Sequence, residues 1–357
     1  MARKRASEFL NQLLEEYHLD AILITNLINV RYLSGFTGSE GSIIFTEKDS
    51  WFLSDPRYRL QAEQEVKGFK VKIFKKKVRE IYSLFKKLKA KKVGFEPFAL
   101  SYQFFVLLKK ELTGIKLIPL KRSLSEVRAI KDKDELENIK RAVEIAEIAL
   151  GRALNQIRAG ITELDFATEL EFQLRKAGSQ GTGFDTIVAS GARSALPHAK
   201  ADNKIMKKGE IVVIDYSANC QGYFSDLTIT IALGEPDKKA KEIYQIVSEA
   251  QKMAIREIKP EQLANQIDKI ARNYIKSKGY GKFFEHGLGH GLGLEVHEQP
   301  AINHISKNKL KTGMVFTVEP GIYLPGKFGV RIEDNVILED NKAKVLSKSN
   351  QALQIFE

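Results

Sequence analysis

Carboxylates stand at the ends of apolar stretches in the second half of the sequence. Asp215 follows Ile-Val-Val-Ile and Glu319 follows Val-Phe-Thr-Val, and each is followed within 14 residues by a second acid, Asp226 or Glu333. An ionised carboxylate at the end of a buried strand is unfavourable unless positive charge compensates it. Arg331, on the same strand face as Glu333, can neutralise one of the acids. The pattern therefore predicts that divalent cations neutralise the others.

Histidines are concentrated in the same part of the chain. Five of the six lie between residues 198 and 304: His198, His286, His290, His297 and His304. Glycine at every second position around His290 suits neither a stable helix nor an ordinary strand, and predicts close approach of the backbone to a ligand. A lone histidine is more often structural. Four carboxylates with one or more imidazoles instead suit a pair of Mn, Co or Fe ions, and zinc less well.

Two similar segments are expected to place the acids. Residues 209–215 and 313–319 each consist of a glycine, five mainly apolar residues and a carboxylate. Each continues through a turn containing glycine and tyrosine into a second strand that carries the next acid. We interpret them as two related hairpins that face a common centre; the alternative is a chance similarity between buried strands.

The length of 357 residues and the order of patterns predict two domains. Residues 1–125 alternate short apolar strands with amphipathic helices, which indicates an α/β domain. A polar stretch marks the boundary, and Asp132 is a suitable N-cap for a long helix over 135–157. Residues 126–357 are expected to form an α+β domain, with further helices over 162–177, 238–258 and 260–278.

Composition and charge exclude several classes of protein. The hydrophobic fraction of 43% and the charged fraction of 29% are those of a folded chain. Of the net charge of +12, the first 125 residues supply nearly all, with 24 Lys and Arg against 13 Asp and Glu. Their helical spacing indicates a solvated face, so we do not expect nucleic acid as a partner. The single cysteine and the absence of a signal peptide or an apolar span predict a cytoplasmic protein without membrane contact.

The motifs together resemble those of the pita-bread metallopeptidases, the group that includes methionine aminopeptidase, aminopeptidase P and prolidase. The resemblance rests on Asp215-Tyr-Ser, Ser225-Asp226-Leu-Thr, His286-Gly-Leu-Gly-His290, Glu319-Pro-Gly and Arg331-Ile-Glu333-Asp. Tyr32-Leu-Ser-Gly-Phe-Thr-Gly and Asp55-Pro-Arg-Tyr resemble the creatinase-type N-terminal domain of Xaa-Pro peptidases. The resemblance covers nearly the whole chain. It implies a creatinase-like α/β domain, a pita-bread catalytic domain, a homodimer and hydrolysis of the bond before proline.

The same resemblance implies a role for each site residue. Two divalent ions, in the first place Mn or Co, would be held by Asp215, Asp226, His290, Glu319 and Glu333, with Asp215 and Glu333 bridging. A water between the ions would attack the scissile carbonyl as hydroxide. Glu319 would also shuttle the proton to the leaving nitrogen. His198 and His297 would bind substrate and stabilise the oxyanion, His286 would be a further histidine of the substrate pocket, and Arg331 would orient a carboxylate ligand.

Two questions stay open at the level of sequence. A dipeptidase and an aminopeptidase acting on longer proline-containing peptides would share these residues. The alternative from another class is a catalytically silent binding protein that keeps the fold and uses its basic N-terminal domain. The presence of all five ligands disfavours that alternative, and it also disfavours creatinase, which shares both domains but lacks the ligand set.

Overall fold

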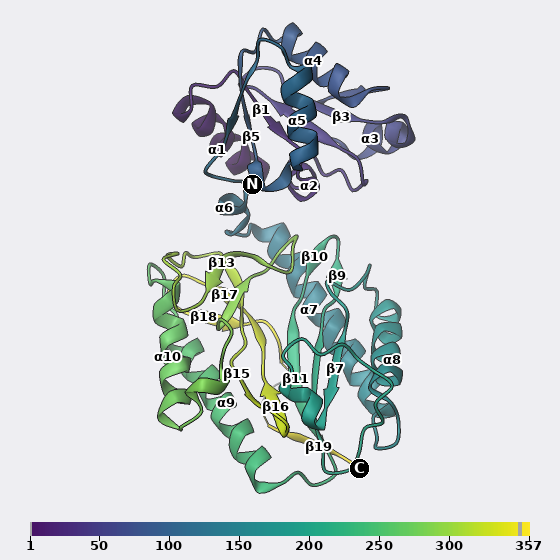
Figure 1. Cartoon of the computed structure of the whole chain (residues 1–357), viewed down its shortest axis with the longest axis vertical. Helices are drawn as coiled ribbons and strands as arrows, with labels where there is room; N and C mark the ends of the chain where they lie inside the picture. Colours follow the sequence, from purple (N-terminus) through teal and green to yellow (C-terminus); the bar gives the residue numbers. More distant parts are fainter. Residues whose placement is uncertain (1, 349–351) are drawn as a thin grey trace. The chain divides into compact units, whose positions relative to one another are not determined.

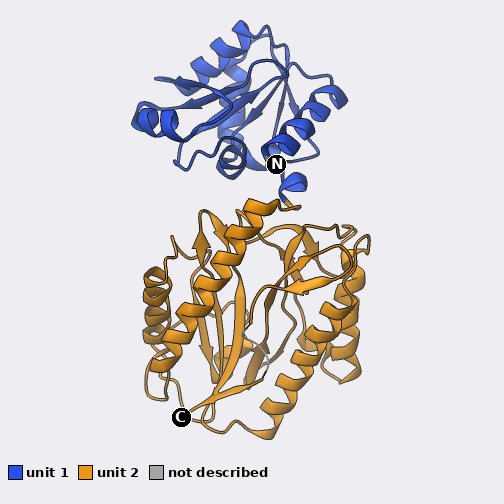
Figure 2. Ribbon diagram, turned by 180° about the vertical axis from the view of Figure 1, so that it is seen from behind, with its two compact units in different colours: residues 1–128 blue, residues 129–357 orange. Residues whose placement is uncertain are grey.

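The computed structural model describes residues 2–348 and 352–357, which fold into two compact units, 1–128 and 129–357 (Figure 2). The first unit is a six-stranded sheet in the order β4-β3-β2-β1-β5-β6. Its strands are β1 (Ala21–Ile24), β2 (Ser42–Phe45), β3 (Trp51–Ser54), β4 (Lys70–Ile73), β5 (Lys92–Phe95) and β6 (Lys116–Pro119). Its helices are α1 (Ala2–Glu16), α2 (Leu27–Ser34), α3 (Arg59–Glu65), α4 (Lys77–Lys87), α5 (Tyr102–Glu111) and α6 (Ser125–Arg128).

The predicted α/β character of the first unit is confirmed. The sheet is mixed, because β2 runs antiparallel to both β1 and β3 while the other neighbouring pairs are parallel. The edge strand β6 was not expected from the sequence. It is only four residues long, and Lys116 and Pro119 at its ends are exposed, so it lacks the apolar alternation that marks a strand.

The two larger sheets of the second unit are each backed by a pair of helices (Figure 1). The four-stranded sheet has the order β19-β11-β8-β7, with β7 (Ile187–Ser190), β8 (Ile211–Tyr216), β11 (Leu227–Leu233) and β19 (Gln354–Phe356). The five-stranded sheet has the order β13-β12-β14-β17-β18, with β12 (Gly289–Gly291), β13 (Glu298–Ile302), β14 (Val315–Val318), β17 (Asp334–Leu338) and β18 (Ala343–Val345). An isolated bridge between Thr228 and Glu333 joins the two sheets.

Four long helices cover the outer faces of these sheets: α7 (Lys133–Ala153), α8 (Glu163–Lys176), α9 (Lys238–Glu257) and α10 (Ala264–Ser277). Buried residues of α7 and α8 share one apolar core with β8 and β11, and those of α9 and α10 share another with β14 and β17. The apolar faces of the helices therefore hold the sheets with their opposite sides turned toward the interior of the unit.

The predicted pair of related segments is confirmed. Strand β8 pairs antiparallel with β11, and β14 pairs antiparallel with β17. Along the chain, a small two-stranded hairpin connects the strands of each pair. It consists of β9 (Asn219–Cys220) and β10 (Tyr223–Phe224) in the first pair, and of β15 (Gly321–Leu324) and β16 (Phe328–Arg331) in the second. The two halves thus repeat one order of elements.

Helix α7 begins at its predicted N-cap, although it ends at Ala153 and not at residue 157, whereas α10 begins later than predicted. Asp132 caps α7 through a capping box with Glu135, as predicted. Helix α10 begins at Ala264, not at residue 260. The amides of Glu261 and Ala264 donate to the carbonyls of Leu310 and Asn308, so the residues before the helix are extended along another segment. Within the described residues, no helix is long and apolar enough to cross a membrane.

Candidate metal centre

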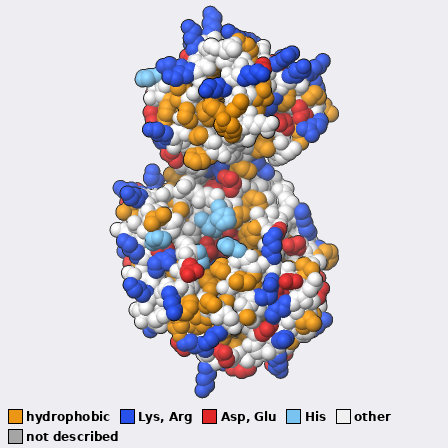
Figure 3. Space-filling view, in the orientation of Figure 1, with side chains coloured by type: hydrophobic (Ala, Val, Ile, Leu, Met, Phe, Trp, Pro, Cys, Tyr) orange, Lys and Arg blue, Asp and Glu red, His pale blue; other side chains and the backbone are white. Residues whose placement is uncertain are grey.

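All nine site residues predicted from the sequence line one cavity of about 550 Å³ in the second unit. They come from both halves of the fold: His198, Asp215 and Asp226 from the first, and His286, His290, His297, Glu319, Arg331 and Glu333 from the second. In the surface view, histidine and acidic side chains gather on one face of this unit (Figure 3). The sixth histidine, His18, lies in the first unit, and His304 does not line the cavity.

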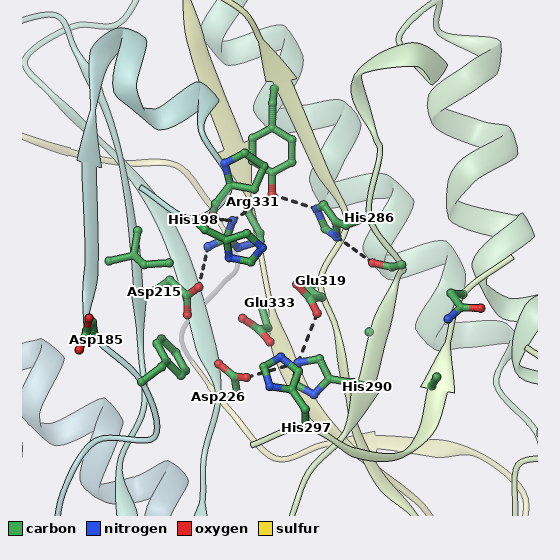
Figure 4. A pocket seen from close by; sticks show the side chains of 18 of the residues that line it. Asp185, His198, Asp215, Asp226, His286, His290, His297, Glu319, Arg331 and Glu333 are labelled. Atoms are coloured by element: carbon green, nitrogen blue, oxygen red, sulfur yellow. Dashed lines mark hydrogen bonds and ion pairs between the residues drawn. The ribbon is translucent and has the colours of Figure 1, made fainter. Parts of the chain in front are cut away.

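The four acids occupy equivalent places on the two strand pairs. Asp215 lies on β8 opposite Thr228 of β11, and Asp226 immediately precedes β11. Glu319 immediately follows β14, and Glu333 immediately precedes β17. Because each strand pair ends at this level, the four carboxylates point toward one another across the cavity (Figure 4). This is the common centre predicted from the sequence similarity.

His290 presents one ring nitrogen to two of these acids. Its Nδ1 lies 3.1 Å from the carbonyl oxygen of Gly291, which only accepts, so Nδ1 carries the proton. Its Nε2 lies 3.4 Å from Asp226 Oδ2 and 3.5 Å from Glu319 Oε1. Burial lowers the pKa of His290 to about 4. The ring is therefore neutral near pH 7, and its lone pair faces two carboxylates.

Arg331 pairs with Asp215 and not with its strand neighbour Glu333. Its Nη2 donates to Asp215 Oδ2 at 2.6 Å, and its Nε donates to Thr228 Oγ1 at 3.1 Å. Glu333 instead accepts a hydrogen bond from Thr228 Oγ1 at 2.7 Å. The expectation that Arg331 shares a strand face with Glu333 is wrong, because β16 ends at Arg331 and the chain crosses to β17 before Glu333 can extend the face.

Burial dominates the protonation of the acids. It raises the pKa of Asp215, which the Arg331 guanidinium opposes, and it raises the pKa of Glu319 to about 8. For Asp226 and Glu333 burial and then repulsion by the neighbouring carboxylates raise the pKa well above its usual range. The protein alone thus supplies too little positive charge for the four acids to be ionised together.

Divalent ions fit this set of groups. Ligand atoms of Asp226, His290 and Glu333 lie within 4.8 Å of one another, as the donors of a single cation would. Among the described residues, the buried Oδ1 of Asp215 has no hydrogen-bond partner, although a buried carboxylate oxygen is normally satisfied. Asp215 and Glu319 extend the cluster with two more hard oxygen donors.

The glycines around His290 are required for packing within the protein, a reason that the sequence did not reveal, and two of them, Gly287 and Gly289, also line the cavity. A Cβ atom on Gly289 would lie 2.0 Å from the carbonyl oxygen of Thr317, and one on Gly291 would lie 2.1 Å from that of Gln299. The segment also forms a short strand, β12, with a bulge after His290. Glycine is required because β12 packs closely between β13 and β14, and this packing fixes the position of His290.

The other three histidines lie on loops around the acids. The ring of His297 packs on that of His290, with centroids 4.2 Å apart. His286 has both ring nitrogens engaged, Nδ1 with the carbonyl of Gly287 at 2.8 Å and Nε2 with the hydroxyl of Tyr323 at 2.9 Å. Burial lowers the pKa of His286 to about 4, so it is neutral. Its predicted part in substrate binding therefore requires that a substrate displace Tyr323 or contact the ring face.

Two ion pairs contact the loops that carry His286 and His297. Glu298, next to His297, pairs with Lys131 at 3.2 Å, with both side chains 1% exposed. Arg272, paired with the buried Asp268 on α10, donates to the carbonyl of His286 at 2.7 Å. Such pairs fix the direction of a loop because both charges must be satisfied in one arrangement.

Comparison with known proteins agrees with this geometry. The model of metallopeptidase family M24 matches residues 137–340, the part of the chain that contains the whole cluster. The chain belongs to this family. The model of the creatinase/prolidase N-terminal domain matches residues 8–130. The chain is thus an M24 peptidase with a creatinase-type N-terminal domain and a pita-bread catalytic domain, as the motifs implied.

The M24 peptidase is similar over its full length to several named relatives. It is 40% identical over 350 residues to a Xaa-Pro dipeptidase of Pyrococcus furiosus, covering 98% of this chain and 99% of the relative. A solved Xaa-Pro dipeptidase from Bacillus anthracis matches with a TM-score of 0.96 at 40% identity over 99% of both chains. A solved X-Pro aminopeptidase from Thermotoga maritima matches with a TM-score of 0.91 at 41% identity, covering 98% of this chain and 99% of that one.

Three contributors to the M24 site were missed from the sequence. The hydroxyl of Tyr323 also accepts a hydrogen bond from Arg331 Nη1 at 2.9 Å, so it joins Arg331 to His286. Thr228 joins Arg331 to Glu333, and Thr317 donates to Glu319 and accepts from the amide of His290. The threonines stand two residues from an acid, which is the only sequence signal that could have singled them out.

Proposed function

We propose that this M24 peptidase uses two divalent metal ions, Mn or Co, to hydrolyse the peptide bond before proline at the N-terminus of short peptides. The observation that carries the proposal is the convergence of Asp226, His290 and Glu333 within 4.8 Å, next to Asp215 and Glu319 and on the floor of an open cavity. A purely structural cluster would be closed to solvent and would not leave a buried carboxylate oxygen without a partner.

The five side chains would hold the ions as two overlapping sets. His290 faces Asp226 and Glu319 with its unprotonated Nε2, and Asp215 offers the oxygen that Arg331 leaves unbonded. When bound, the ions supply an acidified water at neutral pH and polarise the scissile carbonyl. Arg331 then keeps Asp215 ionised and correctly turned.

Glu319 is proposed to carry the proton. Its side chain is 17% exposed to the cavity, and its carboxylate is held by Thr317 and faces His290. The same burial that raises its pKa makes it a stronger base than an ordinary glutamate. It would accept a proton at a carboxylate oxygen and release it to the proline nitrogen as the bond breaks. His198 and His297 line the cavity from loops and would donate to the developing oxyanion.

The preference for proline is supported by the names of the relatives and by the lining of the cavity. Proteins named Xaa-Pro dipeptidase and X-Pro aminopeptidase match over 98–99% of the chain. Phe184, Ile187 and Tyr323 supply apolar surface beside the acids, where a pyrrolidine ring could pack. A tertiary amide also has no N–H that the site must satisfy.

The test compares three peptides on protein that has been stripped with a chelator and reloaded with Mn or Co. Ala-Pro, Ala-Pro-Ala and Ala-Ala differ only in the proline and in the length beyond it. Cleavage of either proline peptide, with Ala-Ala left intact, would support the proposal, and the faster of the two would distinguish dipeptidase from aminopeptidase action. Failure on both proline peptides with metal bound would overturn it.

A further inference from the structure

His198 reaches the cavity from a loop with little regular structure of its own. The loop leaves β7 at Ser190, forms a short 3-10 helix over Gly191–Ala195 and continues through Leu196, which is 55% exposed, to His198. His198 is itself solvent-exposed and lines the cavity near Arg331 (Figure 4). A histidine in such a place has few neighbours to hold it, so its position depends on the anchors of the loop.

One anchor is Glu163, in the first turn of α8. Its side chain is 0% exposed, and its two oxygens accept three hydrogen bonds from the loop. Oε1 accepts from the amide of Ser190 at 2.7 Å and from its hydroxyl at 2.8 Å, and Oε2 accepts from Arg193 Nε at 2.9 Å. The start of the loop is therefore bound to a helix that lies behind the sheet.

Arg193 connects Glu163 to the far end of the loop. Its Nη2 donates to the carbonyl of Lys200 at 2.5 Å, which ties the start of the loop to the segment that follows His198. On the cavity side, Arg331 Nη1 donates to the carbonyl of Pro197 at 3.0 Å. His198 thus lies, in the sequence, between two carbonyls that accept from arginines: that of Pro197, bound by Arg331, and that of Lys200, bound by Arg193.

We propose that the Glu163–Arg193 pair is a positioning device for His198, and this rests on the proposed function of that histidine. Neither Glu163 nor Arg193 lines the cavity, so neither touches a substrate. The pair is only partly buried, since the Arg193 side chain is 28% exposed, and ion pairs that reach solvent add little stability, so the pair is poorly explained by stability alone. It is well explained by geometry, because the guanidinium fork joins a fixed carboxylate to a fixed carbonyl.

The decisive experiment is a double-mutant cycle between Arg193 and His198 on the metal-loaded full chain. Arg193→Met is expected to lower kcat/KM for the cleaved proline peptide by roughly 100-fold, since a misplaced group of about 1 Å costs that much, with metal content unchanged. In a His198→Ala background the same substitution is expected to change kcat/KM by less than about threefold, because the group it positions is gone. Equal losses in both backgrounds would overturn the proposal.

Two further variants guard this result. Arg193→Lys keeps the charge, so it should fold, as judged by its melting temperature. It cannot contact Glu163 and Lys200 at once, so it should lose an intermediate part of the activity. Asp202→Asn removes the charge that faces Arg193 in an exposed contact at 3.6 Å, keeps an oxygen that can accept from the amide of Asn203, and is expected to match the wild type. A full activity for Arg193→Lys together with a fully active Arg193→Met would also overturn the proposal.

A readout without catalysis separates this proposal from the proposed function. The ring resonances of six histidines can be followed by NMR, and His198 is assigned as the one that disappears in His198→Ala. Arg193→Met should shift or broaden the His198 signals and leave those of His286 and His297 unmoved. Unchanged His198 signals would overturn the positioning role. If the wild type cleaves neither proline peptide, the proposed function fails while this arm still decides the positioning role.

Discussion

Arg331 Nη2 donates to Asp215 Oδ2 at 2.6 Å, a contact between β16 and β8 whose two residues lie 116 positions apart in the chain. The contact leaves Oδ1 of the same carboxylate buried and without a hydrogen-bond partner among the described residues. One oxygen of Asp215 is therefore committed to the protein and the other is available to an ion. The arginine both lowers the charge that an ion must neutralise and sets the direction in which Asp215 offers its free oxygen.

Replacing Arg331 with Met is expected to weaken metal binding by roughly 10- to 100-fold, as for other groups that orient a ligand. It should also destabilise the fold by about 3–5 kcal/mol, because Asp215 loses its buried partner. Calorimetric metal titration and urea unfolding measure the two effects. Arg141→Met breaks the exposed pair with Glu144 and serves as the control, with an expected change of about 0–1 kcal/mol. Metal affinity equal to that of the wild type would contradict this account of Arg331.

Glu319→Gln separates binding of the ions from transfer of the proton. The amide keeps an oxygen that can contact a metal but cannot accept the proton, so kcat should fall by about 10²–10⁴-fold while metal remains bound. Elemental analysis of the dialysed protein and kinetics on the same sample test this. Glu261→Gln, at an exposed ion pair, is the matched control with unchanged kcat. A Glu319→Gln variant with normal turnover would exclude Glu319 as the proton carrier.

The metal-free protein should lose stability as the pH rises from 6.5 to 8. In this window the folded state retains a proton on Glu319, whose pKa is about 8, whereas an unfolded glutamate has lost its proton above about 4.5. Burial and repulsion between the carboxylates raise the pKa of Asp226 and Glu333 as well, which acts in the same direction. The folded state then binds more protons than the unfolded state, so stability falls by roughly 1.4 kcal/mol per pH unit for each extra proton. His286 and His290 act in the opposite sense only below 6.5.

Urea midpoints of chelator-treated protein across this range provide the measurement. Saturating Mn or Co should abolish the loss, because ions replace the protons on the carboxylates. A metal-free stability that stays level or increases from pH 6.5 to 8 would show that the carboxylates are ionised without metal.

Tyr323→Phe removes the hydroxyl between His286 Nε2 and Arg331 Nη1 without changing the ring. Two buried polar groups lose a partner, which should destabilise the fold by about 1–3 kcal/mol. Because the hydroxyl no longer donates to Nε2, the tautomer of His286 should become mixed, and its ring ¹⁵N shifts should move toward each other. A His286 spectrum identical to that of the wild type would show that the Gly287 carbonyl alone fixes the ring.

Gly289→Ala should disrupt the site through packing alone. The added Cβ would meet the carbonyl oxygen of Thr317 at 2.0 Å, so β12 must move away from β14 and take His290 with it. We expect a loss of about 1–3 kcal/mol and weaker metal binding. Gly151→Ala, in helix α7 where nothing lies within 4 Å of the new Cβ, should instead stabilise by about 0.5–1 kcal/mol. The two melting curves, measured side by side, test the contrast.

Local signals in the sequence accounted for most of the secondary structure that carries the site. Asp132 and Thr162 mark the starts of α7 and α8 because their side chains satisfy amides that a helix leaves unpaired. The start of α10 was misplaced since the amides before it are satisfied by residues 308–310, a contact across more than 40 positions that no local pattern reveals. The edge strand β6 was missed for a similar reason, as pairing with β5 and not its own composition makes it a strand.

The sequence by itself determined which groups must meet. Four acids at the ends of apolar strands, a histidine among glycines and two repeated segments leave few arrangements in which the carboxylates are both buried and neutralised. Only the tertiary structure decided which of these residues contact one another. Arg331 contacts Asp215 and not Glu333. Tyr323 contacts His286, and Glu163 contacts the loop of His198. The reason is physical. Periodicity within a strand or helix sets the face on which a side chain lies, whereas its partner across the cavity depends on how separately folded elements pack.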